Sequence, residues 1–167
     1  MRVRRASTDD LSALRSLRRV ALTTHPTSFG TSAEEEEATT DDAWRARFLP
    51  GSRATVFLAE SDDAEPLGLA GVRGDGRVRT GHVADLWGVF VLEAARGAGV
   101  GDALVAESIV WARDAGYARM RLFVDTLNMP AIRLYQRHGF VVVGCEPDVI
   151  RVGDDRRDEY LMHYVLR

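Results

Sequence analysis

The chain has 167 residues, of which 46% are hydrophobic and 28% are charged, and its formal net charge is −3. This length suits one domain with a substantial core, and the composition is typical of a globular protein rather than a disordered one. The negative charge and the lack of a basic stripe disfavour nucleic acid as a partner. No apolar run approaches the ~20 residues that a membrane-spanning helix needs. We therefore expect one cytoplasmic domain over residues 1–167 with no membrane partner.

The first half of the chain alternates short strands with helices. Thr8 and the two aspartates after it are typical of a helix N-cap, and leucines follow at three-to-four spacing. The dipeptide His25-Pro26 ends that helix because proline lacks the amide hydrogen. In a later helical segment, Trp44 and Phe48 share one face. Helices are expected over residues 11–21, 32–37 and 41–48, and strands over 3–6, 55–59 and 67–72.

The second half has a denser pattern, which begins with a strand rich in large apolar residues. A glycine-rich loop over 97–101 follows, and Gly139 stands where glycine commonly ends a helix. Further strands are expected over 83–91, 119–125, 140–143 and 159–166, and helices over 102–115 and 130–138. This order predicts a mixed fold of the α+β type.

The glycine-rich loop lies between a predicted strand and a predicted helix. Glycines let the backbone approach a ligand closely, and the N-terminus of a helix attracts phosphate. A dinucleotide-binding G-x-G-x-x-G loop would need glycine at position 102, where this chain has Asp102. The Gly-Lys-Ser/Thr ending of an ATP-binding loop is also lacking. A pyrophosphate-bearing cofactor is therefore expected, without nucleotide hydrolysis or hydride transfer.

Two segments resemble the GNAT superfamily of N-acetyltransferases. The first is VFVLEAARGAGVG over 89–101, in which Arg96, Gly99 and Gly101 match the acetyl-CoA signature Arg/Gln-x-x-Gly-x-Gly/Ala. The second is NMPAIRLYQRHGF over 128–140, which is similar to N-x-x-A-x-x-L-Y-x-x-x-G-F. The two motifs stand in the family's order, and the chain's two ends are also similar to those of the family.

The resemblance implies a GNAT fold and an acetyltransferase. The expected fold is a central, mixed, mostly antiparallel sheet of six to seven strands with about four helices, splayed near Val91 at the acetyl-CoA site. The expected reaction moves an acetyl group from acetyl-CoA to a primary amine of a small molecule or protein by direct attack. The alternative is a non-catalytic sensor domain that binds acyl-CoA. Homodimer formation is open in either case.

The resemblance also implies which residues contact the cofactor. The backbone at the end of the strand pairs with pantetheine and polarises the thioester carbonyl, and the loop supplies N–H groups to the pyrophosphate. Asn128 caps the next helix and contacts the pantetheine arm. The full set comprises Val89, Phe90, Val91, Arg96, Gly97, Ala98, Gly99, Val100, Gly101, Asp102 and Asn128.

Tyr135 is the candidate general acid. Without the family its helical spacing would indicate a core aromatic. In the family this tyrosine donates a proton to the leaving thiolate, which is reasonable because a phenol of pKa ~10 stays protonated at neutral pH. The sequence therefore leaves a structural and a catalytic reading of Tyr135, and the resemblance favours the catalytic one.

The general base is less clear from the sequence. Some relatives place a glutamate where this chain has Phe123, so Asp85 is the candidate base, acting directly or through a water. The alternative is a solvent-facing strand aspartate without a chemical role. Glu60, Asp125 and Glu159 are weaker candidates for the base. The scattered histidines and the lone Cys145 predict neither a metal site nor a covalent intermediate.

Overall fold

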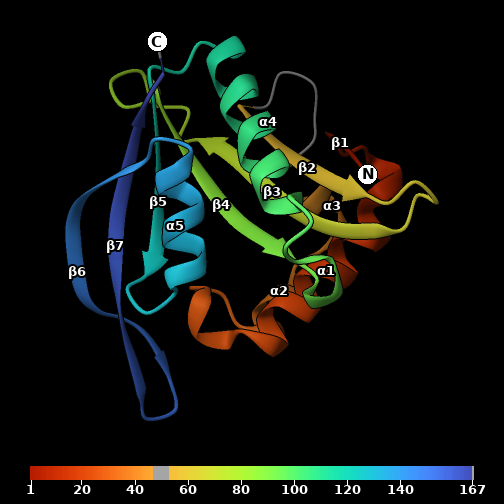
Figure 1. Cartoon of the computed structure of the whole chain (residues 1–167), viewed down its shortest axis with the longest axis horizontal. Coiled ribbons are helices and arrows are strands. Elements are labelled where there is room, and N and C mark those ends of the chain that lie inside the picture. The colour runs from red at the N-terminus through yellow and green to blue at the C-terminus, as the bar shows by residue number, and fades with distance from the viewer. Residues whose placement is uncertain (47–52, 167) are drawn as a thin grey trace.

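A computed structural model describes residues 1–46 and 53–166. Phe48 lies outside the described residues, so its predicted place beside Trp44 is untested. The described residues form seven strands and five α-helices (Figure 1). The strands are β1 (Arg2–Arg5), β2 (Ala54–Glu60), β3 (Pro66–Gly74), β4 (Val83–Val91), β5 (Arg119–Asp125), β6 (Val141–Val152) and β7 (Asp155–Val165). The helices are α1 (Leu11–Thr24), α2 (Ala33–Ala38), α3 (Asp41–Arg45), α4 (Val100–Asp114) and α5 (Met129–Arg137), with short 3₁₀ turns η1 (Thr8–Asp10), η2 (Pro26–Ser28) and η3 (Glu93–Ala95).

The strands form one sheet in the order β1-β2-β3-β4-β5-β7-β6. Neighbouring strands are antiparallel except β4 and β5, which are parallel. This parallel pair is joined only from Val83↔Arg119 to Asp85↔Arg121, and the rest of β4 has no partner on β5. The predicted mixed, mostly antiparallel and splayed sheet is confirmed, and the splay begins well before Val91.

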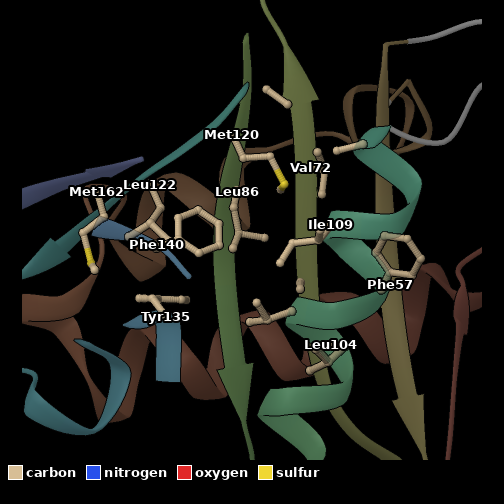
Figure 2. Packing of buried hydrophobic residues seen from close by; sticks show 14 of the residues in the cluster. Phe57, Val72, Leu86, Leu104, Ile109, Met120, Leu122, Tyr135, Phe140 and Met162 are labelled. Carbon is tan, nitrogen blue, oxygen red and sulfur yellow. The ribbon is translucent and has the colours of Figure 1, made fainter. Parts of the chain in front are cut away.

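Helices cover both faces of the sheet. On one face, Leu104 and Ile109 of α4 and Tyr135 of α5 pack into a cluster with residues of β2, β3, β4, β5 and β7 (Figure 2). On the other face, the leucines of α1 and Trp44 of α3 pack against alternate residues of β2, β3 and β4. The three-to-four spacing of leucines in α1 therefore marks its buried side, as predicted.

The β6–β7 hairpin differs from the sequence prediction. The strands were expected to end at 143 and to begin again at 159, but β6 runs to Val152 and β7 starts at Asp155. Pro147 and Asp148, which has a φ of 54°, lie at an irregularity in the register of β6. The prediction failed because this outer part is mostly exposed and so lacks the alternation that identifies a half-buried strand.

One helix start differs from the prediction. Five α-helices are present in the described part of the chain, which agrees with the five helical segments expected from the sequence. Helix α4 begins at Val100 rather than Asp102, because Gly99 takes the left-handed conformation and serves as the N-cap. The helix therefore starts inside the glycine loop.

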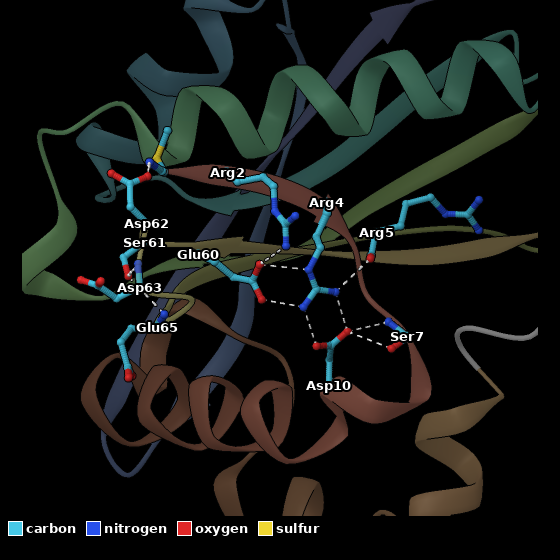
Figure 3. Close-up of polar contacts among 11 residues, drawn as sticks. Arg2, Arg4, Arg5, Ser7, Asp10, Glu60, Ser61, Asp62, Asp63 and Glu65 are labelled. Atoms are coloured by element: carbon cyan, nitrogen blue, oxygen red, sulfur yellow. Dashed lines mark hydrogen bonds and ion pairs between the residues drawn. The ribbon is translucent and has the colours of Figure 1, made fainter.

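A charged network ties β1 to β2 and to the start of the first helix (Figure 3). The Arg4 guanidinium contacts Glu60 with Nη2–Oε1 at 2.5 Å and Asp10 with Nη2–Oδ1 at 2.7 Å. Asp10 also accepts a hydrogen bond from the backbone N–H of Ser7 at 2.7 Å. The hydrogen bonds from Arg4 lower the pKa of Asp10 from 3.8 to about 2. The link from β1 to the start of the first helix therefore depends on the ionised form of Asp10.

Leu104→Ala should destabilise the fold strongly. The side chain is 0% exposed between α4 and β3, so truncation leaves a cavity that costs about 2–5 kcal/mol in the free energy of unfolding. Val110 lies on the same helix but is 45% exposed, and Val110→Ala is the matched control with an expected effect below about 1 kcal/mol. Urea unfolding of both variants measures the difference, and equal losses would contradict this packing.

Asp10→Asn should remove an acid-sensitive part of the stability. The folded pKa lies below the unfolded value, so this contribution is present above pH 3.8 and disappears as the pH falls toward about 2. At neutral pH the variant should lose up to about 2 kcal/mol, and the difference from wild type should shrink at lower pH. Denaturant titrations between pH 7 and pH 3 test this, and a difference that does not change with pH would contradict it.

Candidate active site

A cavity of about 770 Å³ opens where β4 and β5 part. One wall is the end of β4, and a second is the loop from Arg96 to Asp102 with the start of α4. The third wall comes from the end of β5 and from α5, and the α1–α2 connection contributes residues from His25 to Phe29. The splay thus brings three segments that are distant in the sequence, residues 25–29, 89–102 and 125–137, around one space.

The glycine loop leaves the N-terminus of α4 open. Gly97 and Gly99 have φ values of 80° and 79°, which L side chains rarely adopt, and an added Cβ at either would meet nothing within 4 Å. Gly99 has no side chain with which to cap the helix, so the first N–H groups of α4 need another partner. Gly101 is needed for close packing, since its Cβ would lie 3.2 Å from Cδ2 of Leu134. The loop has the geometry of an anion cradle.

Two arginines border this cradle. Arg96 donates from Nε to the carbonyl of Val91 at 3.2 Å, and its Nη2 lies 2.8 Å from Nε2 of His25. Arg137 of α5 donates from Nη2 to Oδ2 of Asp102 at 3.0 Å, which lowers the pKa of that carboxyl. The carboxylate in the first turn of α4 is thereby neutralised, so it does not cancel the attraction of the helix end for anions.

The end of β4 contains an irregularity next to the cavity. Leu69 of β3 pairs with Phe90, but Gly71 pairs with Trp87, so β4 carries an extra residue here. Gly88, with a φ of 64°, lies within this bulge. A bulge interrupts the ladder on the β3 side, and β5 has already parted on the other side. The backbone at Val89 and its neighbours therefore lies where it can bond a ligand.

Tyr135 and Asn128 belong to the same wall. Asn128 caps α5 by accepting the N–H of Ala131 at 3.2 Å, as the sequence predicted. Tyr135 is 7% exposed, packs edge-on against Phe140 and lines the cavity. Burial raises the pKa of Tyr135, which keeps its hydroxyl protonated. Tyr135 is thus both a core aromatic and a cavity residue.

A model of the acetyltransferase (GNAT) family matches residues 14–140. This chain belongs to that family. A mycothiol acetyltransferase from Salinispora arenicola is 32% identical over 84% of this chain, but the match spans 44% of that relative's length. A GNAT-family acetyltransferase from Streptococcus pneumoniae has 26% identity and a TM-score of 0.85, with 99% of both chains covered. A Salmonella typhimurium protein solved with its cofactor acetyl-CoA has 26% identity and a TM-score of 0.83, covering 100% of this chain and 94% of its own.

In this GNAT domain, Asp85 lies apart from Tyr135. It is in the paired part of β4, where its Oδ1 bonds Nε of Arg121 and its Oδ2 lies 3.9 Å from Nε of Arg73. It is not among the residues that line the cavity. Its role as a base stays a prediction, and this position favours instead the structural alternative that the sequence left open.

Of the other carboxylates considered from the sequence, Asp125 reaches the cavity. Glu60 is held by Arg2 and Arg4 in the network at β1. Asp125 ends β5 and lines both the main cavity and a slot of about 80 Å³ between the parted strands. The slot contains Phe29, Trp87 and Phe123, the last of which is 47% exposed. The residue that replaces the family's glutamate therefore forms part of an aromatic wall.

Two further features concern residues 1–46 and 53–166, the part of the chain that the structure describes. No group of three His, Cys, Asp or Glu side chains there is arranged to hold a metal ion. None of the helices in this part of the chain has the length and apolar character needed to cross a membrane. Cys145 is exposed on β6, and it is not among the cavity-lining residues.

Proposed function

We propose that this GNAT domain transfers an acetyl group from acetyl-CoA to a primary amine of a small molecule or a protein. The observation that carries the proposal is the cavity itself, which has an open helix N-terminus at one end and a buried phenol in its wall. Acetyl-CoA carries a pyrophosphate, which matches the anion cradle, and a pantetheine arm, which matches the edge of β4 that β5 leaves unpaired. The Salmonella relative with acetyl-CoA supports the same cofactor.

In the proposed reaction the amine attacks the thioester directly. The loop from Gly97 to Asp102 would bind the pyrophosphate, with Arg96 holding the loop against β4. Backbone N–H groups of Val89 and Val91 would bind pantetheine and stabilise the developing oxyanion, and Phe90 lies between them in the same strand wall. Asn128 would contact the pantetheine arm, and Tyr135 would give its proton to the departing sulfur because burial keeps the phenol neutral.

The proposal also covers the acceptor of the acetyl group, the assembly of the protein and its location in the cell. The acceptor is an amine, and the protein acts in the cytoplasm as a monomer or a homodimer. The non-catalytic sensor is the competing function: it would keep the cofactor cradle but would need neither Tyr135 as a proton donor nor a base.

Acetyl-CoA should bind the wild type with micromolar affinity, and Gly99→Glu should abolish binding. The new carboxylate would stand at the helix N-terminus that receives the pyrophosphate. Gly116→Glu is the matched control, since Gly116 lies beyond the opposite end of α4 with a similar φ of 81° and nothing within 4 Å. Calorimetry on the three proteins decides this, and equal binding in all of them would refute the cradle.

Tyr135→Phe should lower kcat for amine-dependent thiol release by about 10²-fold or more while acetyl-CoA affinity stays within about twofold. The ring keeps its packing against Phe140, so only the hydroxyl is lost. Thiol release is first screened on the wild type with a panel of amines. Acetyl-CoA binding without turnover of any amine would favour the sensor, and full activity of Tyr135→Phe would exclude the phenol as the acid.

A further inference from the structure

Two carboxylates meet at the edge of the cavity. Asp125 of β5 and Glu159 of β7 are directly opposite in the antiparallel register, so their side chains share one face with Cβ atoms about 5 Å apart. Asp125 is 6% exposed and Glu159 9% exposed. Asp125 lines the cavity and the aromatic slot, both of which Tyr135 also lines. A buried pair of like charges thus stands beside the proposed acid.

The two members of this pair differ in their partners. Asp125 accepts the N–H of Leu127 at 2.9 Å, and its Oδ2 lies 3.5 Å from Nε of Arg157. The side chain of Glu159, in contrast, has no hydrogen bond or ion pair with any residue in the described part of the chain. Because most of this side chain is buried, its charged form is less favourable than in water, and a cation or a proton would compensate the charge.

The surroundings of the pair favour a cation or a proton. Burial raises the pKa of Glu159, and the charges of Asp125 and Glu146 raise it further. The other charged or titratable groups around the pair are Arg157 on β7, Glu146 opposite Glu159 on β6, and Tyr135 on α5. The nearby η2 turn, residues 26–28, carries no charged side chain.

We propose that the Asp125–Glu159 pair binds the ammonium group of the acceptor and accepts its proton before attack. This inference rests on the proposed acetyl transfer and assigns its base. Asp125, which lines the cavity, is the catalytic residue that touches the ammonium. Glu159 is a positioning residue that acts through Asp125, because a second negative charge raises the proton affinity of the pair as a unit.

The proton balance of the step is closed. One N–H proton of the ammonium passes to Asp125, and the neutral nitrogen forms a bond to the thioester carbon. The carbon–sulfur bond breaks, and the thiolate takes the proton of Tyr135. The nitrogen's surplus proton restores the phenol, and Asp125 releases its proton to solvent. The products are an N-acetylated amine, the free thiol of coenzyme A and one proton.

The slot also indicates the kind of acceptor. Phe29, Trp87 and Phe123 line it together with Asp125. An ammonium held by Asp125 would therefore have aromatic side chains next to its first carbon atoms. The best acceptor is a primary ammonium whose neighbouring group is apolar, and 2-phenylethylamine is the probe of this class.

The first experiment needs no turnover. In carbon-13 NMR titrations of the wild-type protein, the Glu159 carboxyl should titrate above the ordinary glutamate range. In the Asp125→Asn variant the pKa of Glu159 should be lower, because the Asp125 charge that raises it is gone. Adding 2-phenylethylammonium chloride should lower the wild-type value, whereas 2-phenylethanol with sodium chloride at equal ionic strength should not. A Glu159 pKa that does not change when the ammonium is added would overturn the proposal even if the protein proved inactive.

The second experiment uses the pH dependence of kcat/KM with an amine that the wild type acetylates. The profile should rise at low pH as the pair loses its proton. In Glu159→Gln this rise should move to lower pH, because the carboxyl whose pKa burial and the Asp125 charge raise is gone from the pair. Asp125→Asn should lower kcat/KM by about 10²-fold or more.

Controls separate this result from a failure of the fold or of the proposed function. Acetyl-CoA affinity should stay unchanged in both variants, and Glu107→Gln, on the exposed surface of α4, should reproduce the wild-type profile. A wild type that acetylates amines while Glu159→Gln keeps the wild-type profile would overturn the inference alone. If the rise of kcat/KM with pH is lost in Asp85→Asn but kept in Asp125→Asn and Glu159→Gln, Asp85 is the base.

Discussion

The parting of β4 from β5 is the constraint on which the rest of the site depends. The strands share a ladder only from Val83 to Asp85, and beyond it the backbone of β4 needs other partners. Helices packed on both faces hold the two strands in place, so the gap does not close by simple strand pairing. The same gap contains the cavity and the slot, and it leaves the β5-facing edge of β4 unpaired, which explains why these three features coincide.

The two ends of the cavity prefer opposite charges. The open N-terminus of α4 attracts anions, and Arg137 offsets the carboxylate of Asp102 beside it. Across the cavity, Asp125 and Glu159 form an anionic pair at the end of β5. The phosphate-bearing donor is therefore favoured at the helix end and a cationic acceptor at the Asp125 end, although Arg157 partly offsets the charge of Asp125.

The sequence predicted the parts of this structure that depend on short segments. The glycine loop, the Asn128 cap and the buried face of α1 each lie within about fifteen consecutive residues, so spacing and residue type suffice to identify them. The Asp125–Glu159 pair depends on a strand register between distant segments, which no local pattern contains. Asp85 was chosen for its place before the motif, but the ladder that ends at Asp85 holds it against Arg121 instead. The outer part of the β6–β7 hairpin was missed because exposed residues and Pro147 conceal its strand character.

Desolvation gives the proposed acid and base a common physical origin. Burial favours the neutral forms of Tyr135 and Glu159 alike, so the phenol keeps its proton and the carboxylate pair gains affinity for one. An ammonium that enters this site forms an ion pair with Asp125 in a region of low dielectric constant. Transfer of one proton converts that ion pair into a neutral amine and a neutral acid, and burial favours this change because isolated charges are costly there. The environment that makes an unpaired Glu159 unfavourable in the free protein is thus the one that would generate the nucleophile.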